Sequence, residues 1–305
     1  MLFSPMTSTV IGNMGWVDQG RLWCFNIQTQ KEDWIETGDA SHLSVSAGTD
    51  SFFRVVHHQR SNFKVSIRSH AEPSRELASI HGREDVSTFE GDTTLWDCVE
   101  PAFITYVDNQ VNLKHIDGDR RQVLNVDLSW YNDADYDRGY QGLTDAITLK
   151  GHGLVVVSVQ RSSKLVIIDV SRNEAIDRIS LAGRGGNPTM RLCSARRLLA
   201  SDYDTLCLVD LDDRKTRDSA RLQESDPTNT MQFLGDYDLD ENGDILVARP
   251  FSGDVLRLDP DFRIVDRTLV GGQPLALCST PTSRFVIRDW QSGRVTMGEF
   301  ANSKS

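Results

Sequence analysis

The sequence has few cysteines and no long apolar run, and each absence excludes a class of protein. No window approaches the roughly 18 consecutive apolar residues of a transmembrane helix. The first twenty residues lack a basic segment followed by an apolar one, so we expect no signal peptide. An odd, scattered set of cysteines without a C-x-x-C pair argues against a disulfide framework or a zinc ribbon. We therefore expect small buried thiols in a reducing compartment, which predicts a cytoplasmic protein. The cysteines are Cys24, Cys98, Cys193, Cys207 and Cys278.

Positive charge is also scarce. The 305 residues include 33 Lys and Arg against 44 Asp and Glu, a formal net charge of −11. Affinity for nucleic acids and for anionic membranes comes largely from Lys and Arg, so both classes of partner are disfavoured. The partner expected from composition is a protein or a small molecule, and the oligomeric state is left open.

Catalytic signatures are missing as well. The sequence has no G-x-S-x-G elbow, no P-loop and no H-E-x-x-H pair. His57 and His58 are neighbours in a predicted strand, so their side chains point to opposite faces and cannot share one metal ion. Whether the protein is an enzyme is therefore not decided by motifs.

Helical periodicity is nearly absent, and what remains is a succession of short strands. Apolar runs and two-residue alternation are closed by polar turns such as RSN, DNQ, FSG and QSG. Examples of such strands are FKVSIRS (63–69), KLVIIDV (164–170) and TLCLVDL (205–211). The pattern predicts an all-β protein.

The strands recur with a period. When the third strand of each unit is aligned, its first apolar residues stand 40 to 54 positions apart. Four-stranded units at that spacing match the blades of a β-propeller. We predict a single β-propeller domain over 1–305, made of antiparallel four-stranded blades, most simply seven of them. The aligned residues are Leu22, Phe63, Val111, Leu165, Leu206, Val255 and Val295. The expected blades are 7–40, 41–82, 94–127, 143–182, 188–222, 233–271 and 273–300.

The ends of the sequence leave two ways to close a ring. The pattern of the first unit begins at a second strand, and the last unit supplies only three strands. Either residues 2–6 complete the first blade, or the ring closes by packing without a full interlocking strand. A Trp in a strand of a propeller is usually buried between blades. Trp23, Trp34 and Trp290 are therefore expected to pack between blades.

The best-defined units carry a family resemblance. In LVIIDVSRNEAIDRISLAGRGGNPTMRL, a strand ending in Ile-Asp is followed by a polar turn, a strand and a glycine-rich connection ending in proline. RIVDRTLVGGQPLAL repeats the latter part. This resembles the YVTN-type repeats and the lactonase-like seven-bladed β-propellers, most clearly over 143–278, although the YVTN tetrapeptide is absent. The resemblance implies the fold; these propellers include enzymes, sensors and scaffolds, so it does not imply one activity.

Two acidic stretches can be compared with calcium loops. In LSWYNDADYDRGYQGLTDAI (128–147), three aspartates fit the first positions of an EF-hand loop, but Arg138 replaces the required Gly and Thr144 the required Glu. An irregular calcium site remains an alternative. In DLDENGDI (238–245), Asn242-Gly243 favours a tight hairpin turn over a cation loop.

Long connections point to a binding face. Three of them precede first strands, at 82–94, 127–142 and 222–232, and long loops on a rigid scaffold often carry recognition. We predict an interaction module that recognises a protein or a small ligand on this loop-rich face. The candidate residues are Trp96, Glu100, Trp130, Tyr131, Asp135, Tyr136, Arg138, Tyr140, Asp145, Asn187 and Asp236.

The alternative is a metal-assisted hydrolase, lactonase-like enzyme, isomerase or cyclase with its site at the channel mouth. No cofactor is expected for the interaction module, whereas this alternative would use a divalent cation. In lactonase-like propellers that use calcium, carboxylates and amides near the start of the first strands converge on the metal. The corresponding residues here would be Glu100, Asp145, Asn187 and Asp236.

Overall fold

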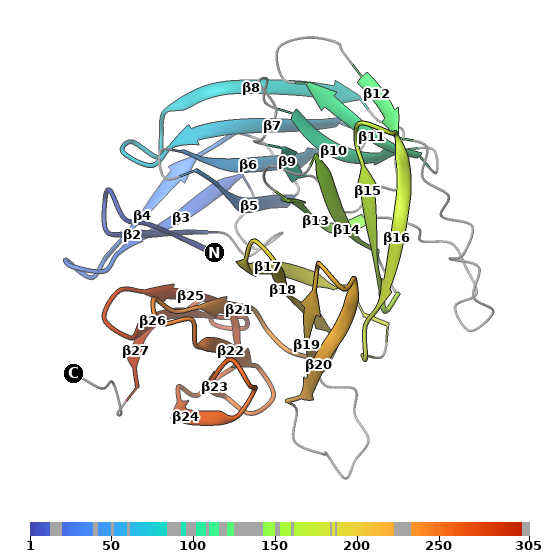
Figure 1. Ribbon diagram of the computed structural model, residues 1–305. Coiled ribbons are helices and arrows are strands. Elements are labelled where there is room, and N and C mark those ends of the chain that lie inside the picture. Colours follow the sequence, from blue (N-terminus) through green and yellow to red (C-terminus); the bar gives the residue numbers. More distant parts are fainter. Residues whose placement is uncertain are drawn as a thin grey trace. The chain divides into compact units, whose positions relative to one another are not determined.

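A computed structural model defines the fold. It describes residues 1–12, 20–38, 42–49, 52–59, 62–83, 93–95, 102–107, 110–115, 121–124, 143–149, 153–159, 162–183, 185–186, 188–222 and 233–300. The chain divides into two compact units, one made of 1–83 with 223–305 and the other of 84–222. Every regular element among the described residues is a β-strand, and consecutive strands pair antiparallel (Figure 1).

The unit made of 1–83 and 223–305 contains three four-stranded sheets and one three-stranded sheet. The first sheet is β1 (Leu2–Ser4), β2 (Thr9–Gly12), β3 (Arg21–Asn26) and β4 (Lys31–Glu36). The second is β5 (His42–Thr49), β6 (Phe52–Gln59), β7 (Asn62–Ser69) and β8 (Glu76–Arg83). The third is β21 (Tyr237–Leu239), β22 (Ile245–Arg249), β23 (Asp254–Leu258) and β24 (Ile264–Leu269). The last is β25 (Pro274–Thr280), β26 (Arg284–Asp289) and β27 (Val295–Glu299).

The unit made of 84–222 contains three four-stranded sheets. One is β9 (Thr93–Leu95), β10 (Ala102–Val107), β11 (Gln110–His115) and β12 (Arg121–Leu124). The next is β13 (Leu143–Leu149), β14 (Leu154–Val159), β15 (Lys164–Asp169) and β16 (Glu174–Ser180). The third is β17 (Thr189–Ser194), β18 (Arg197–Asp202), β19 (Thr205–Asp210) and β20 (Lys215–Arg221).

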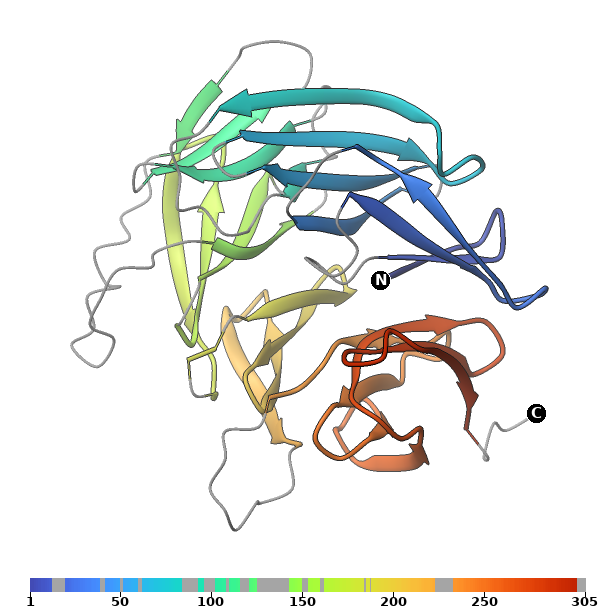
Figure 2. The ribbon, with the colours of Figure 1, turned by 180° about the vertical axis from the view of Figure 1, so that it is seen from behind.

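The strand period read from the sequence matches the sheets. Each predicted third strand is the third strand of a sheet, so the all-β class and the four-stranded antiparallel blades are confirmed. The first sheet starts earlier than residue 7, because β1 pairs with β2 through Leu2 and Ile11. Residues 2–4 therefore complete the first sheet. The last sheet has three strands within the described residues, and β27 lies at its outer edge (Figure 2).

Apolar side chains pack between successive sheets. A strand alternates its side chains between two faces, so a sheet can bury apolar side chains against a neighbour on either side. One cluster joins the first sheet to the last through Trp23 and Val286, so Trp23 packs as predicted. Between β13–β16 and β17–β20, the cluster includes Leu149, Val156, Leu165, Ile167, Ile179, Met190, Leu198, Ala200 and Val209. Between β21–β24 and β25–β27, it includes Leu246, Ala248, Val255, Leu277, Phe285, Ile287 and Phe300.

The glycine-rich connections contact an aspartate of the sheet they enter. The Gly186 N–H donates to Asp202 at the end of β18 over 2.8 Å, and the Gln273 N–H donates to Asp289 at the end of β26. A Cβ atom on Gly183 would lie 2.3 Å from the Asp202 carboxyl carbon. Only glycine fits there, which explains the recurring glycines of the repeat in terms of a close approach.

The described cysteines are free thiols. Cys24, Cys207 and Cys278 are buried as expected, and burial raises the pKa of the Cys207 thiol to about 11. Cys193 is exposed, because β17 turns its end toward solvent, and Cys98 lies outside the described residues. Among the residues that the structure describes, no helix is long and apolar enough to cross a membrane.

Packing between sheets gives a first prediction. Leu198 is fully buried between two sheets, and its replacement by Ala leaves a cavity that lowers the free energy of unfolding by roughly 2–5 kcal/mol. Leu192, in the same sheet, is 38% exposed, and L192A should change the free energy of unfolding by about 0.5 kcal/mol or less. Urea unfolding followed by fluorescence measures both. Equal losses in the two variants would contradict the assignment of the core.

Candidate functional site

Most of the predicted site residues lie outside the described part of the chain. The two that are described are Asp145, in the first strand β13, and Asp236, just before the first strand β21. They belong to different compact units, and each is therefore described within its own unit. The candidates outside the described residues are Trp96, Glu100, Trp130, Tyr131, Asp135, Tyr136, Arg138, Tyr140 and Asn187.

Asp145 connects two sheets. It lies in β13, and its Oδ2 accepts the backbone N–H of Met190, in the first strand of the next sheet, over 2.8 Å. Its Oδ1 accepts the N–H of Ala146 over 2.8 Å. The Ser158 hydroxyl continues the connection by donating to the Pro188 carbonyl over 2.6 Å. The carboxylate therefore fixes β13 against β17 through a charge-assisted bond to a backbone amide.

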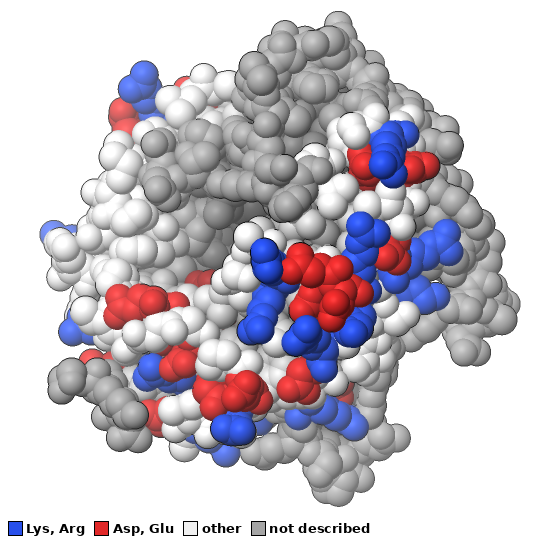
Figure 3. All heavy atoms as spheres, in the orientation of Figure 1, with Lys and Arg blue, Asp and Glu red and all other residues white. Residues whose placement is uncertain are grey.

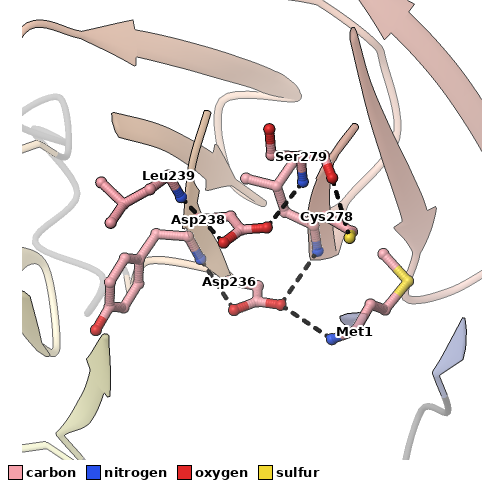
Figure 4. A network of polar contacts seen from close by, with 8 residues as sticks. Met1, Asp236, Asp238, Leu239, Cys278 and Ser279 are labelled. Carbon is pink, nitrogen blue, oxygen red and sulfur yellow. Dashed lines mark hydrogen bonds and ion pairs between the residues drawn. The ribbon is translucent and has the colours of Figure 1, made fainter. Parts of the chain in front are cut away.

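Asp236 repeats this arrangement in the other unit (Figure 4). Its Oδ1 accepts the N–H of Tyr237 over 3.0 Å, and its Oδ2 accepts the N–H of Leu277 in β25 over 3.4 Å. The ammonium group of Met1 lies 3.4 Å from the same Oδ2. Two residues further along, Asp238 accepts the N–H of Ser279 over 2.9 Å. Asp236, just before β21, and Asp238, within it, thus bind alternate amides of β25.

These contacts bear on the predicted ligands of a divalent cation. Asp145 and Asp236 each already accept at least two backbone hydrogen bonds, which a cation would have to replace. Within the described residues, no group of three or more His, Cys, Asp or Glu side chains is placed to hold a metal ion. Glu100 and Asn187 lie outside that part of the chain, so the divalent-cation site stays a prediction.

The acidic hairpin 238–245 is a turn, as the Asn-Gly pair indicates. Asp240 Oδ1 accepts the N–H groups of Asn242 over 2.8 Å and Asp244 over 3.0 Å. Gly243 has a φ of 82°, which only glycine adopts without strain. Arg257 neutralises the hairpin through Asp244, 2.7 Å away. The hairpin turn predicted for this stretch is thus confirmed, and hydrogen bonds from backbone N–H groups to Asp240 close it.

The structure brings together an aromatic cluster that the sequence did not reveal. We call Phe233, Phe251 and Trp290 the aromatic cluster. Phe233 precedes the first strand β21, Phe251 lies in the turn between β22 and β23, and Trp290 follows β26. First-strand connections and turns between second and third strands lie on one face of a propeller, which is the face we predicted for binding.

The geometry of the aromatic cluster leaves part of it open to solvent. The rings of Phe233 and Phe251 meet edge to face at 5.1 Å between centroids, and those of Phe233 and Trp290 at 6.5 Å. Phe251 is 45% exposed and Trp290 is 46% exposed. The prediction that Trp290 packs between blades is therefore wrong, because it lies just past the end of β26, where the chain turns outward. The alternating strand pattern offered no signal for this.

Buried ionic contacts hold the turn that carries Phe251. The Arg249 guanidinium binds Asp254 through two of its nitrogens, Nε to Oδ1 over 2.8 Å and Nη2 to Oδ2 over 2.6 Å. Asp254 is fully buried and Arg249 is nearly so, which makes this pair insensitive to solvent screening. Gly253, at a φ of 67°, completes the turn. The aromatic ring is thus presented on a rigid hairpin.

Hydrogen bonds hold the turn that carries Trp290. The Asp289 carboxylate accepts the N–H and the hydroxyl of Ser292, both over 2.7 Å, and the N–H of Gln273. Burial opposes its charge, but these hydrogen bonds outweigh burial and hold the pKa of the carboxyl below its usual value. The backbone N–H of Trp290 donates to the backbone carbonyl of Gln273 over 3.0 Å. Both halves of the turn are thereby fixed to the preceding connection.

Other indole groups are placed differently. Trp34 is 36% exposed, and the guanidinium groups of Arg21 and Arg288 lie over its ring, 4.7 Å and 5.3 Å from the ring centroid. Arg288 also lies 5.6 Å from the ring of Trp23. Since Arg288 is in β26 and both Trp residues are in the first sheet, these cation–π contacts join the last sheet to the first.

Comparison with known proteins gives the fold. No family model and no curated protein match the sequence. Among solved structures, the β-propeller domain of Cps50 (Swd1) from Myceliophteria thermophila is similar, with a TM-score of 0.69, 14% identity, and coverage of 97% of this chain and 94% of that one. The structure of U3-55K is similar with a TM-score of 0.65, 13% identity, and coverage of 97% and 93%. Identities this low show the fold alone, and the fold is a β-propeller.

The carboxylate contacts between sheets give a second prediction. Replacing Asp145 by Ala leaves the N–H of the buried Met190 without its acceptor and should lower the free energy of unfolding by roughly 1–3 kcal/mol. Asp218 is an exposed aspartate whose carboxylate accepts the N–H of the next residue, Ser219, in the same strand β20. This bond joins no two sheets, so D218A is a matched control. Urea unfolding measures both, and an unchanged D145A would refute the role of this bond.

A third prediction concerns pH. Since the pKa of Asp289 is lowered in the folded state, its contribution to stability is present above its unfolded pKa, roughly 4, and is lost as the pH falls through the folded pKa. The wild type should therefore be more stable than Asp289→Asn at pH 7, and the difference should shrink below about pH 4. Unfolding curves at several pH values test this. A difference that grows on acidification would contradict it.

Proposed function

We propose that this chain is a single seven-bladed β-propeller that binds a protein partner on the face bearing the first-strand connections. The observation that carries the proposal is the exposed aromatic cluster, Phe251 and Trp290 over Phe233, on that face. Rigid, half-exposed aromatic rings are the residues that dominate binding energy at protein interfaces. They cost little conformational entropy to fix, because the turns beneath them are already held in place.

The rigidity of the aromatic cluster supports a role in protein recognition over that of loops that merely face solvent. Both exposed rings lie on tight turns closed by charged hydrogen bonds, from Arg249 to Asp254 and from Ser292 to Asp289. A preformed surface loses less freedom when a partner binds. The long connections at 82–94 and 127–142, with Trp96, Trp130 and Tyr136, are expected on the same face and would extend the contact surface.

The resemblance of residues 143–278 to YVTN-type repeats fits this proposal, and so does the similarity of nearly the whole chain to two solved structures, one of them a β-propeller domain. The described free thiols support a reducing compartment such as the cytoplasm.

Surface charge favours a protein over a nucleic acid. On the face shown in Figure 3, the Lys and Arg side chains of the described residues alternate with Asp and Glu. Over β19 and β20, for example, Arg217 binds Asp210 over 2.8 Å and Asp213 over 3.3 Å. Basic groups that are already paired with carboxylates are poorly placed to neutralise a row of phosphates.

No observation among the described residues favours the alternative of a metal-assisted enzyme. The carboxylate oxygens of Asp145 and Asp236 already accept backbone N–H groups, which a cation would have to replace. It remains testable. A cation site at the channel mouth would raise the melting temperature in Ca²⁺ or Zn²⁺, and replacement of Asp145 would remove that shift.

The fourth prediction tests the proposed binding face. Phe251→Ala and Trp290→Ala together should abolish capture of the proteins that the wild type retains, because exposed aromatic anchors often contribute about 2 kcal/mol or more each. The double variant should keep its fold, since both rings lie on the surface. Quantitative affinity capture with mass spectrometry measures the loss.

The matched control removes exposed apolar groups elsewhere in the same unit. Ile264 and Leu269, in the outer strand β24, are 61% and 73% exposed, so Ile264→Ala with Leu269→Ala removes a similar kind of surface away from the turns. The control should retain every partner. Deletion of residues 130–140 tests the neighbouring connection in the same assay. Retention of all partners by the aromatic variant would refute the proposed face.

A further inference from the structure

A cavity of about 590 Å³ lies beside the first sheet, within the unit made of 1–83 and 223–305. It is lined by residues of the first sheet and by the connection between β7 and β8 of the second sheet. Small molecules bind in protein cavities of roughly 300–1,000 Å³. The lining includes no residue of the aromatic cluster, so the cavity is a separate feature of the chain.

One face of the first sheet forms the floor of the cavity. In the ladder between β3 and β4, Cys24 pairs with Asp33 and Leu22 pairs with Ile35, so these side chains share a face. Leu22 and Cys24 are buried in a cluster with Val55 of β6, and Ile35 packs against that cluster. The floor at Cys24 and Ile35 is therefore apolar.

Two opposite charges stand at the mouth of the cavity. Lys31 and Asp33 are alternate residues of β4, so their side chains leave the same face, from Cα atoms about 6.5 Å apart. Both residues are exposed, whereas Cys24 is buried. Burial, and then the negative charge of Asp33, raise the pKa of the Cys24 thiol to about 12. The carboxylate thus lies near the thiol, and the thiol stays neutral at pH 7 as part of the apolar floor.

Neither charge is neutralised by another side chain within the part of the chain that the structure describes. Lys31 forms no ion pair there, and Asp33 uses only its Oδ1, which accepts the N–H of Trp34 over 2.8 Å. The amide of Asn26, which also lines the cavity, is in contrast occupied, because its Nδ2 donates to the Thr7 carbonyl over 3.1 Å. One ammonium group and one carboxylate oxygen are therefore available to a ligand.

The opposite wall of the cavity is fixed by polar contacts. Pro73 and Ser74, in the connection between β7 and β8, line this wall. Nη1 of the buried Arg68 donates to the carbonyl oxygens of both residues, over 3.3 Å and 3.0 Å. The Ser4 hydroxyl of β1 donates to the His70 carbonyl over 3.3 Å, which ties the same connection to the first sheet. A preformed cavity loses little freedom when a ligand enters.

We propose that this cavity binds a zwitterionic α-amino acid with an apolar side chain. The α-ammonium group binds Asp33, the α-carboxylate binds Lys31, and the apolar side chain lies on the floor formed by Cys24 and Ile35. The two charges of an amino acid are adjacent, as are the two charges on β4. A ligand with a single charge would leave one of the protein charges unmatched. The volume of the cavity accommodates even an aromatic side chain.

This proposal goes beyond the proposed protein-binding face and does not depend on it. The cavity lies between the first sheet and the β7–β8 connection, whereas the aromatic cluster belongs to turns of the third and last sheets of the same unit. The variant that lacks Phe251 and Trp290 should therefore bind the amino acid as the wild type does.

The fifth prediction uses three probes that share one phenyl group. L-Phenylalanine carries both charges, phenethylamine carries only the ammonium group, and 3-phenylpropionate carries only the carboxylate. Isothermal titration calorimetry of the full chain at pH 7 and low ionic strength measures the three affinities. L-Phenylalanine should bind about fivefold more tightly than either analogue, because each exposed ion pair contributes up to about that factor.

Two variants assign the charges of the probe to the two residues. Asp33→Asn should weaken L-phenylalanine and phenethylamine about fivefold and should not weaken 3-phenylpropionate. Lys31→Met should weaken L-phenylalanine and 3-phenylpropionate about fivefold and should not weaken phenethylamine. Both residues are exposed, so the variants should keep the fold, which circular dichroism and the melting temperature verify.

The matched control combines Lys215→Met with Asp218→Asn. It removes the same two charges from β20, the corresponding outer strand of another sheet, and it should bind all three probes as the wild type does. Absence of L-phenylalanine binding at millimolar concentration would overturn the proposal. Equal binding of the three probes, unchanged in both cavity variants, would also overturn it, because the cavity would then recognise the phenyl group alone.

Discussion

Burial of apolar sheet faces against neighbouring sheets is the constraint on which the rest of this structure depends. A four-stranded sheet alternates apolar side chains to two sides, and neither side is stable in water alone. The cluster around Leu198 and Val156 satisfies this need between two sheets, and the cluster around Leu246 and Phe285 satisfies it between two others. At roughly 1.5–3 kcal/mol for each fully buried side chain, these clusters outweigh any single polar contact described above.

The carboxylate contacts have a different role. Apolar packing is non-directional, and it would tolerate one sheet sliding along the next. Asp145 to Met190, and Asp236 and Asp238 to Leu277 and Ser279, each join a side chain of one first strand to a backbone amide of the following one. Hydrogen bonds with defined geometry fix the register that packing leaves loose. Polar groups therefore determine alignment, while apolar groups determine stability.

Much of the fold could be predicted from the sequence, because strand periodicity and turn chemistry are local. The third strand of every sheet began within one residue of its predicted position, for example β15 at Lys164. The first strand of the first sheet was harder, because Leu2–Ser4 is too short to show alternation. The number of blades in a closed ring and the single-domain organisation remain predictions.

The candidate site was less accessible to sequence reasoning. Asp145 and Asp236 were singled out correctly by position, but a carboxylate at the start of a strand has the same signature whether it binds a cation or an amide. Phe251 and Trp290 belong to turns of different sheets, and their approach to Phe233 depends on how those sheets pack. Trp290 in particular looked like a continuation of an apolar strand, and only the turn held by Asp289 directs it outward.

The spacing of the carboxylate contacts has an evolutionary consequence. The donor and acceptor of the bonds from Leu277, Ser279 and Thr282 are each 41 residues apart, and those of Met190 and Asp145 are 45 apart. Each bond thus spans one repeat. A gene duplication that inserted one more repeat would bring both a new carboxylate for the following sheet and a new amide for the preceding one. The contact that aligns neighbours is therefore copied together with the unit it aligns, so that a chain of this kind can lengthen by duplication without inventing a new junction.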